Sequence, residues 1–530
     1  MGRLPAAFAA ALLLSLGVVI PAAGQKRGGV LTVTHPDSPA SMSMHEEGTY
    51  SVVVPAMGVF NNLVFYDQHQ PRTSMATIVP ELATRWAWDE DGTALTFTLR
   101  QGVKWHDGKA FTAADVKCTW DVLAGRGAEK LRLNFREAWY ENLAEVTTKG
   151  DDEVTFRLKR RQPAFLAMLA SGYSAVYPCH VSLRDMRQKP IGTGPFKFVE
   201  YKPNQGIKLT RNPDYWKPGL PYLDGIEYTI IPNRSTAMLS FIAGKFDMTF
   251  PYEVTVPLLK DVKSQAPHTM CEMRPVNVRV YLLVNHTAAP FDRLELRQAM
   301  ALAIDRRAFI TILDDGQGDV GGVQLPPPEG LWGMPAEMLR DLPGYRSDVQ
   351  KARDEARELM KKLGYGPDKR LKVTVSTRNL PRYRDPAAIL MDQLKEIWID
   401  GELETIETAN WVPKLMRKDY TVSLALSGSA LDDPDPQYFE NYLCNTPRNV
   451  TGYCNPELDK MIVAQSMEAD QEQRKQLVWK IERLLIDDAV RPIIYFRRAA
   501  TCWQPAVKNM SVMANGPYNG WRMEDLWLDR

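Results

Sequence analysis

The pattern of apolar residues changes character near residue 275, and this change constrains the fold most strongly. Before it, alternating segments follow one another closely, as at residues 94–100, 152–160 and 196–231. Alternation over about four to eight residues is typical of half-buried strands. From about residue 275 to 495, strand patterns alternate with helical patterns instead, which is typical of an α/β lobe. The sequence therefore predicts an α/β protein built from units of different construction.

Chain length also favours more than one unit. The chain has 530 residues, whereas single hydrophobic cores stop growing near ~250–300 residues. We therefore expect two or three domains. Within them, Thr112 is placed to cap a helix whose dipole favours Asp115 in the first turn. Gly364 is placed to end a second helix, over residues 347–366.

The N-terminal residues have the layout of a secretory signal peptide. Arg3 precedes an apolar run from Leu4 to Ile20, and small residues follow at 22–24. This order predicts cleavage near Gly24–Gln25, and a membrane anchor is the alternative interpretation. No cysteine stands at the cleavage site, so we do not expect a lipid anchor. We expect residues 1–24 to be a signal peptide that is removed from an exported protein.

The charge balance gives no reason to expect nucleic acid as a partner. The formal net charge is +1, with 65 basic and 64 acidic residues. Loss of residues 1–24 removes one arginine and no acid, which leaves equal numbers of both signs. Binding to nucleic acid or to anionic lipid rests on an excess of basic residues. We therefore expect neither as a partner.

The chain contains six cysteines, and an exported protein is able to form disulfides. No two of them form a Cys-x-x-Cys pair, so zinc ribbons and thioredoxin-type motifs are not indicated. We expect Cys444 and Cys454 to pair, because they close a short loop. The sequence does not choose between free thiols and bridges for the other four, which are Cys118, Cys179, Cys271 and Cys502.

The sequence offers no motif for catalysis or for a metal. The Gly-Tyr-Ser at residues 172–174 begins like a nucleophile elbow but lacks the second glycine. His45 and Glu46 begin like a zinc-protease helix, but Thr49 stands where the second histidine is needed. Prolines break the acidic run at residues 432–435, so its spacing does not match a calcium loop. We expect no enzymatic activity, no metal and no cofactor.

Four side chains follow predicted strands of the α/β lobe. Arg378, Arg382 and Arg384 come after one strand pattern, and Trp411 comes after the next. Loops at the C-terminal ends of strands are where α/β folds bind ligands. A surface or packing role is the plainer interpretation of any one of them, but their shared placement favours a ligand site.

Five segments together resemble a known family. The first segment is PELATRWAWDEDGTALTFTLRQGVKWHDGKAFTAADVKCTWD, and the others follow in order: IGTGPFKFVEYKPNQGIKLTRNPDYW, LRQAMALAIDRRAFI, DDPDPQYF and TGYCNPELDKMI. This ordered set is similar to the family 5 extracellular solute-binding proteins, which are the peptide, nickel and opine receptors of ABC importers. The resemblance extends over nearly the whole mature chain.

The resemblance implies a two-lobed periplasmic-binding-protein fold of type II, with an extra subdomain inserted in lobe one. Lobe one would comprise residues 25–56, 190–270 and 497–530, the inserted subdomain residues 57–189, and lobe two residues 271–496. The lobes would close over a small-molecule or peptide ligand, and an ABC transporter permease in the inner membrane would recognise the closed form. We expect the protein to act in the periplasm as a monomer.

The resemblance also implies which residues meet the ligand. Those on the lobe-one side are His45, Glu46 and Thr49, and those on the lobe-two side are Arg382, Trp411, Ser427, Ser429, Ala430 and Asp432. Arg382, or alternatively Arg378, matches the region where dipeptide receptors hold a carboxylate. A planar guanidinium group suits that task.

One position departs from the peptide receptors of the family. Where they carry an aspartate that binds the α-amino group of the peptide, this chain has Ala430. A desolvated ammonium group needs a charged partner. Asp432, Glu46 or Glu47 would have to supply it; otherwise the ligand lacks a free amine at that point.

These observations predict a substrate-binding protein of an ABC importer that captures a short peptide or peptide-like compound. A non-peptide ligand is the alternative: an opine, an oligosaccharide or a nickel chelate, for which Met42, Met44 and His45 are suggestive. An exported hydrolase is a second alternative, but it would need a nucleophile–base pair or a metal cluster. A sensor subunit that binds the same ligand is a third.

Overall fold

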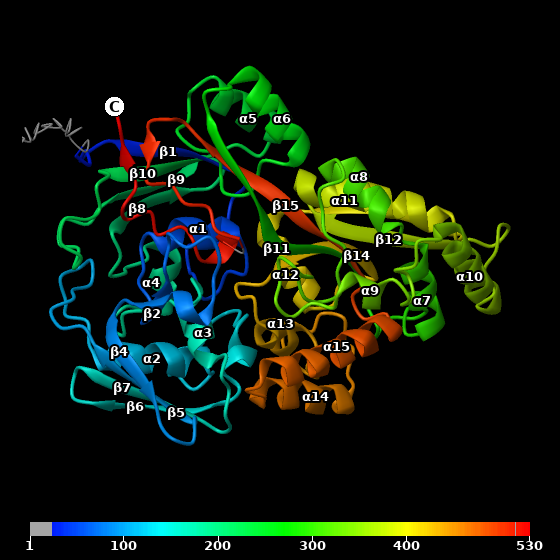
Figure 1. Cartoon of the computed structure of the whole chain (residues 1–530), viewed down its shortest axis with the longest axis horizontal. Coiled ribbons are helices and arrows are strands. Elements are labelled where there is room, and N and C mark those ends of the chain that lie inside the picture. The colour runs from blue at the N-terminus through cyan, green and yellow to red at the C-terminus, as the bar shows by residue number, and fades with distance from the viewer. Residues whose placement is uncertain (1–23, 515) are drawn as a thin grey trace, which may run out of the picture.

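The computed structural model describes residues 24–514 and 516–530. The predicted signal peptide, residues 1–24, lies outside them except for Gly24. The protein consists of two lobes that lie side by side, and two long strands, β11 (Met270–Val284) and β15 (Ile493–Trp503), run from one to the other (Figure 1). The two-lobed α/β architecture predicted from the sequence is confirmed.

Lobe one is built on a four-stranded sheet. Its strands lie in the order β1 (Val30–His35), β10 (Gly225–Ile230), β9 (Gly206–Arg211) and β8 (Phe196–Lys202). The first pair is parallel and the other pairs are antiparallel. Ile207 and Leu209 of β9 are buried while Lys208 between them is exposed, as the alternating pattern predicts. The helices of this part are α1 (Tyr50–Met57), α5 (Arg234–Ile242) and α6 (Val256–Gln265).

A second, fully antiparallel sheet lies below the first in Figure 1. Its order is β4 (Ala83–Trp88), β5 (Ala94–Leu99), β7 (Glu153–Leu158) and β6 (Leu143–Lys149). Helix α2 (Ala113–Leu123) begins after Thr112, the cap expected from the sequence, and Asp115 completes a capping box because its Oδ2 accepts from the Thr112 backbone N–H at 3.0 Å. The smaller elements around it are β2 (Val64–Tyr66), β3 (Ile78–Pro80), α3 (Phe165–Ala170), α4 (Leu183–Gln188), and the short 3-10 helices η1 (Met75–Thr77) and η2 (Glu137–Tyr140).

Lobe two contains a five-stranded mixed sheet. Its order is β13 (Ile399–Ile406), β12 (Leu371–Arg378), β14 (Val422–Gly428), β11 and β15. Nine helices surround it among the described residues: α7 (Leu294–Ala303), α8 (Arg306–Asp314), α9 (Ala336–Leu339), α10 (Val349–Lys362), α11 (Pro381–Lys395), α12 (Thr408–Met416), α13 (Pro434–Asn441), α14 (Pro456–Met467) and α15 (Gln471–Asp487). Gly364 follows α10 at φ +83°, the left-handed position at which glycine ends a helix.

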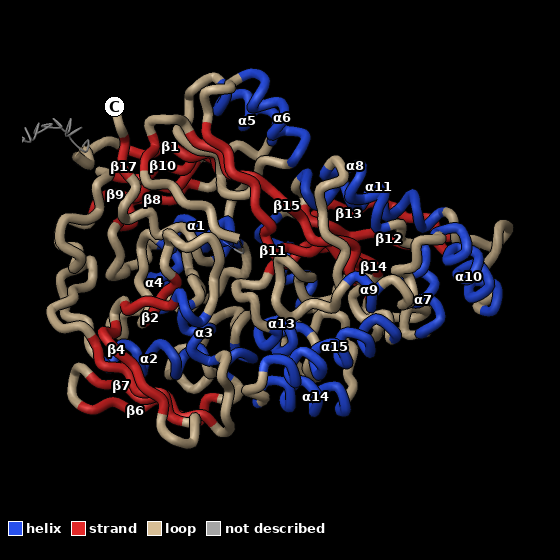
Figure 2. The backbone as a smooth tube through the Cα atoms, viewed as in Figure 1, coloured by secondary structure: helices blue, strands red, loops and turns tan. Residues whose placement is uncertain are grey.

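The strands β11 and β15 connect the lobes. They pair with each other from Met270–Trp503 to Tyr281–Ile493, and β11 also pairs with β14 in lobe two. At the opposite end, Trp503 forms a bridge with Met248 of lobe one. Figure 2 shows the two strands running between the lobes. Because both strands belong to both lobes, the lobe boundaries given above stay a prediction.

Three disulfides cross-link the chain: Cys118–Cys179, Cys271–Cys502 and Cys444–Cys454. The last is the pair expected from the sequence, and the second joins β11 to β15. The C-terminal residues return to lobe one through β16 (Val507–Lys508), η3 (Gly516–Tyr518) and β17 (Trp527–Leu528). Within residues 24–514 and 516–530, no helix has both the length and the apolar character needed to cross a membrane.

Candidate ligand-binding site

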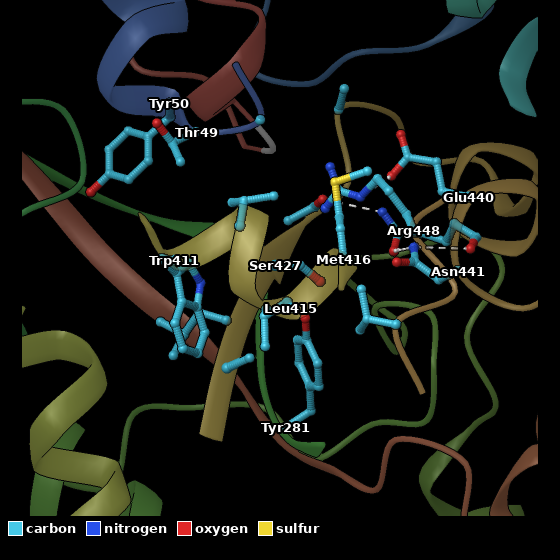
Figure 3. A pocket seen from close by; sticks show the side chains of 18 of the residues that line it. Thr49, Tyr50, Tyr281, Trp411, Leu415, Met416, Ser427, Glu440, Asn441 and Arg448 are labelled. Carbon is cyan, nitrogen blue, oxygen red and sulfur yellow. Dashed lines mark hydrogen bonds and ion pairs between the residues drawn. The ribbon is translucent and has the colours of Figure 1, made fainter. Parts of the chain in front are cut away.

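A cavity of about 90 Å³ lies between the two lobes. Lobe one contributes the N-terminal end of α1, the segment around η2 and the C-terminal segment. Lobe two contributes α12, the end of β14 and the region of α13 with its following loop. Figure 3 shows Thr49 and Tyr50 on one side of this space, with Trp411, Ser427 and Arg448 across from them.

Local sequence explains how lobe two presents its side of the cavity. Trp411 and Leu415 are one helical turn apart in α12, so both lie on its buried face. The indole of Trp411 packs edge-to-face against Tyr383, with ring centroids 6.1 Å apart. Ser427 lies at the C-terminal end of β14, and Arg378 at the C-terminal end of β12. Strand ends therefore position this wall, as expected for an α/β lobe.

Arg378 joins the lobes through a buried ion pair with Asp37, which follows β1 of lobe one. Thr408 Oγ1 also donates to Asp37 Oδ2, at 2.7 Å. Burial raises the pKa of Asp37, but the nearby charge of Arg378, aided by His35 and Arg382, outweighs it and holds that pKa below its ordinary value. The carboxylate is therefore ionised at neutral pH.

Arg382 makes a second buried interlobe ion pair, with Glu253. Its guanidinium carbon lies 4.9 Å from the centre of the Tyr50 ring, and the Tyr50 hydroxyl donates to the same carboxylate. Arg382 does not line the cavity between the lobes; Arg378 does. Arg378 and Arg382 were the two candidates for binding a carboxylate. Arg378 lies in the cavity wall, whereas Arg382 forms a contact between the lobes.

The wall of the cavity is rich in arginine. It contains Arg136, Arg378, Arg448 and Arg491, against one acidic residue, Glu440. Arg448 Nε lies 3.3 Å from Glu440 Oε2. Arg491 donates to Asn441 Oδ1 and to the Arg448 carbonyl oxygen, both at 2.7 Å. The carboxylate of Glu440 is therefore paired with Arg448, a cation of the same lobe.

Thr49, Trp411, Ser427 and Ala430, which the family resemblance assigns to the ligand site, all line the cavity. Ala430 is 2% exposed, and its methyl group supplies no charge. The structure thus brings together four of the nine predicted ligand residues. Their role in binding stays a prediction, because lining a cavity is not contact with a solute.

The other predicted residues lie away from this cavity. His45 Nε2 bonds to the Ala175 carbonyl oxygen at 2.9 Å, and its ring packs on Tyr177. Glu46 accepts hydrogen bonds from Arg187 at 2.6 and 2.8 Å. Both are therefore held inside lobe one.

Ser429 and Asp432 also lie outside the cavity wall. Ser429 is buried, and its backbone N–H donates to the Asn277 carbonyl oxygen at 3.2 Å. Asp432 accepts from the Leu331 N–H at 2.9 Å and lines a different cavity. Burial raises the pKa of Asp432 to about 7. None of Glu46, Glu47 and Asp432 lines the cavity between the lobes, so the structure brings none of these three carboxylates to its wall.

The acidic run at residues 432–435 has a structural partner. Arg474 bonds to both oxygens of Asp433 at 2.8 Å and to Asp435 Oδ1 at 3.0 Å. Gln162 of lobe one also donates to Asp435, at 3.0 Å. No group of three or more possible metal ligands occurs among the residues that the structure describes. The run therefore anchors the start of α13.

Several wall residues have no signal in the sequence. Tyr173 and Tyr518 stack with ring centroids 5.1 Å apart, although 345 positions separate them by number (518 − 173). Arg136, Arg448 and Arg491 come from three further segments. No local motif marks these residues, because only the tertiary fold brings them together.

The family comparison decides the class of the protein. The family model described as bacterial extracellular solute-binding proteins, family 5, middle region, matches residues 77–449. The chain belongs to family 5 of the extracellular solute-binding proteins. The resemblance found in the sequence is thereby confirmed.

Relatives of this family 5 protein span most of its length. The oligopeptide-binding protein AppA of Bacillus subtilis (strain 168) is 28% identical over 445 residues, which cover 80% of this chain and 78% of AppA. The periplasmic binding protein DppA from Helicobacter pylori, solved with the peptide STSA, superposes with a TM-score of 0.82 at 22% identity, over 95% of this chain and 99% of DppA. AgaA from A. tumefacien R10, solved with agropinic acid, gives 0.81 at 21% identity, over 95% and 99%. The two structures share the fold.

Proposed function

We propose that this family 5 protein is the periplasmic substrate-binding protein of an ABC importer. It captures a small solute, a short peptide or peptide-like compound, between its lobes and delivers it to the permease. The observation that carries the proposal is the cavity between the lobes, whose wall combines Thr49 of lobe one with Trp411 and Ser427 of lobe two. AppA and DppA, by their names and the bound peptide, support a peptide-like solute.

Capture works through the balance between open and closed forms. The ion pairs Arg378–Asp37 and Arg382–Glu253 exist only where the lobes meet. A solute shifts this balance only by binding the closed form more tightly than the open form. Side chains contributed by both lobes, such as Thr49 and Trp411, provide that difference, because an open cleft separates them. The closed surface is then what the permease recognises.

The proposed setting follows from the sequence. The signal peptide exports the chain to the periplasm without a lipid anchor, where it acts as a monomer and meets the permease at the inner membrane. It performs no catalysis and needs no cofactor. Belonging to a solute-binding family supports this assignment over an exported hydrolase.

A non-peptide solute is the second candidate, and Ala430 favours it. The cavity wall contains one carboxylate, that of Glu440, and Arg448 is its partner. An α-ammonium group would therefore find no unmatched negative charge there. The complex of AgaA with agropinic acid shows that the same fold holds a compound of another class. An oligosaccharide or a nickel chelate belongs to the same alternative.

Uptake and growth test the proposal. A strain lacking this chain and a strain lacking the partner permease are grown on mixed short peptides as sole nitrogen source. Import predicts that both deletions reduce growth and uptake to the same extent. A sensor predicts that deletion of the permease leaves the response to the solute intact, and that result would replace transport by sensing.

A further inference from the structure

The cavity between the lobes carries an excess of positive charge. Two of its four arginines have carboxylate partners, since Arg378 pairs with Asp37 and Arg448 pairs with Glu440. The other two, Arg136 and Arg491, have no Asp or Glu oxygen within 4.0 Å among the described residues. Arg136 is 2% and Arg491 4% exposed. Two guanidinium groups are thus buried at the cavity without a counter-charge.

Most of the polar atoms left unpaired at this wall are N–H donors, and the one exception is the Thr49 hydroxyl, which can donate or accept. Nε and Nη1 of Arg136, Nε of Arg491 and Nε1 of Trp139 are buried and have no hydrogen-bond partner within the described part of the chain. The remaining nitrogen of Arg136, Nη2, donates to the Glu47 carbonyl oxygen at a long 3.5 Å. Buried polar groups are normally paired, so several donors without acceptors at one cavity indicate that a solute supplies acceptors.

Aromatic rings hold the Arg136 guanidinium in place. Its central carbon lies 3.3 Å from the centre of the Tyr173 ring, and Tyr173 stacks on Tyr518. Burial raises the pKa of Tyr518 well above its ordinary value, and the charges of Arg448 and Arg136 oppose this rise. Both cations therefore act on the same tyrosine pair from the two sides of the cavity. A planar guanidinium group fixed by stacking has the geometry that suits a planar acid.

We propose that the solute is an organic anion, recognised through a carboxylate by Arg136 and the neighbouring arginines and not through an ammonium group. The inference rests on the proposed capture of a solute at this cavity and specifies its chemical class. N-modified peptide-like acids and simple organic acids share the required chemistry.

On this proposal, closure of the lobes depends on a bound anion. Closing the lobes brings Arg136 of lobe one and Arg491 of lobe two to the wall of one cavity, and these two unmatched like charges repel at low dielectric. A carboxylate between them converts this repulsion into charge-assisted hydrogen bonds, which belong to the closed form alone. The anion thus provides the differential affinity on which closure depends.

Four probe compounds distinguish recognition of a peptide's carboxylate from recognition of its ammonium group. We would measure binding of four compounds by calorimetry and thermal shift: dialanine, N-acetyl-dialanine, dialanine amide and glutarate. We expect N-acetyl-dialanine to bind at least as tightly as dialanine, glutarate to bind, and dialanine amide to bind at least tenfold more weakly. Tighter binding of the amide, or no binding of either compound that lacks an ammonium group, would overturn the proposal.

A matched pair of variants tests the role of Arg136. We expect Arg136→Gln to weaken binding of the best carboxylate probe by about 10- to 100-fold, which is the range for one charge-assisted hydrogen bond. Arg132→Gln is the control, because Arg132 has a side chain 58% exposed, pairs with Glu46 and does not line the cavity. Equal affinities of the two variants would refute the assignment. Circular dichroism of both variants checks that each is folded.

Chemical labelling of the bound solute distinguishes a wrong solute class from an absence of solute capture. The mass bound to the protein purified from its own periplasm is extracted and treated separately with a carboxyl-esterifying and an amine-labelling reagent. The proposal predicts a mass shift with the first reagent only. A bound solute that takes the amine label, whether or not it also takes the ester, would end the inference and leave capture intact. No bound mass together with no probe binding would count against both.

Discussion

Arg378, at the C-terminal end of β12 in lobe two, forms a buried ion pair with Asp37, which follows β1 in lobe one. The two side chains are 2% and 7% exposed. Their contact lies beside the cavity whose wall Arg378 helps to form. The same arginine therefore links contact between the lobes to the wall of the proposed solute site.

Asp37→Asn should weaken solute binding by destabilising the closed form. Removing one partner of a buried pair costs about 3–5 kcal/mol, and the open form does not carry this loss. We expect affinity to fall by at least about 100-fold. Small-angle X-ray scattering should show a protein that stays open when solute is added. Asp529→Asn is the control, because it removes an exposed pair with Lys26, whose atoms are 2.7 Å apart, and exposed pairs contribute about 0–1 kcal/mol. Closure as complete in D37N as in D529N would contradict the role of the pair.

Trp411→Ala should reduce affinity through loss of an apolar contact. The indole is 3% exposed and lines the cavity. Truncation of a buried aromatic anchor costs about 2 kcal/mol or more, so we expect a loss of roughly 30-fold in calorimetric titration. Trp88→Ala is the matched control, because Trp88 packs in β4, away from the cavity wall. Unchanged affinity in W411A would remove this residue from the site.

Removing the Cys444–Cys454 disulfide should affect binding as well as stability. The bridge closes the loop that carries Arg448 into the cavity. Its loss should lower the free energy of unfolding by about 2–3 kcal/mol and weaken binding of a carboxylate probe several-fold. Serine replacement of Cys118 and Cys179 is the control: we expect a lower melting temperature with affinity preserved. Equal affinities of the two double variants would show that the loop does not position Arg448.

Stability should fall as the pH rises towards neutrality, in part because of Glu482. Burial raises the pKa of Glu482 from 4.5 to about 7, although the backbone N–H groups of Gln324 and Met334 oppose this rise. The folded protein thus holds this proton more tightly than the unfolded chain. The resulting stability is complete below about pH 4.5 and is lost as the pH passes about 7.

A shift of this size corresponds to roughly 3 kcal/mol. Melting temperatures measured from pH 5 to pH 8 should therefore decline in the wild type and decline less in Glu482→Gln. Glu47 and Asp432, whose pKa values burial also raises to about 7, keep some slope in the variant. Parallel curves for the two proteins would contradict the assignment.

Local sequence signals were sufficient for much of the fold. Alternation located β5, β7 and β8–β10, the Thr112–Asp115 pair located the start of α2, and Gly364 located the end of α10. The extent of the crossing strands was less visible. The pattern at residues 491–496 predicts a short strand, whereas β15 continues to Trp503. Its second half pairs with β11, from which more than 200 residues separate it, as the Cys271–Cys502 bridge shows.

The candidate site was predictable only in part, from the family resemblance. Ser427 and Ala430 lie just before the DDPDPQYF segment, and both line the cavity, as do Trp411 and Thr49. His45 and Glu46 belong to a polar segment whose side chains turn into lobe one, where Ala175 and Arg187 bind them. Arg136 shows why the remainder was missed. Its guanidinium group is buried without an acidic partner among the described residues. Only three-dimensional contacts reveal this.

Native mass spectrometry of the protein purified from its own periplasm tests the central claim most directly. The spectrum is recorded under native conditions and again after denaturation. Solute capture between the lobes predicts one small additional mass per mature chain in the native spectrum and its loss on denaturation. The same mass under both conditions, equal to that of the mature chain alone, would contradict capture.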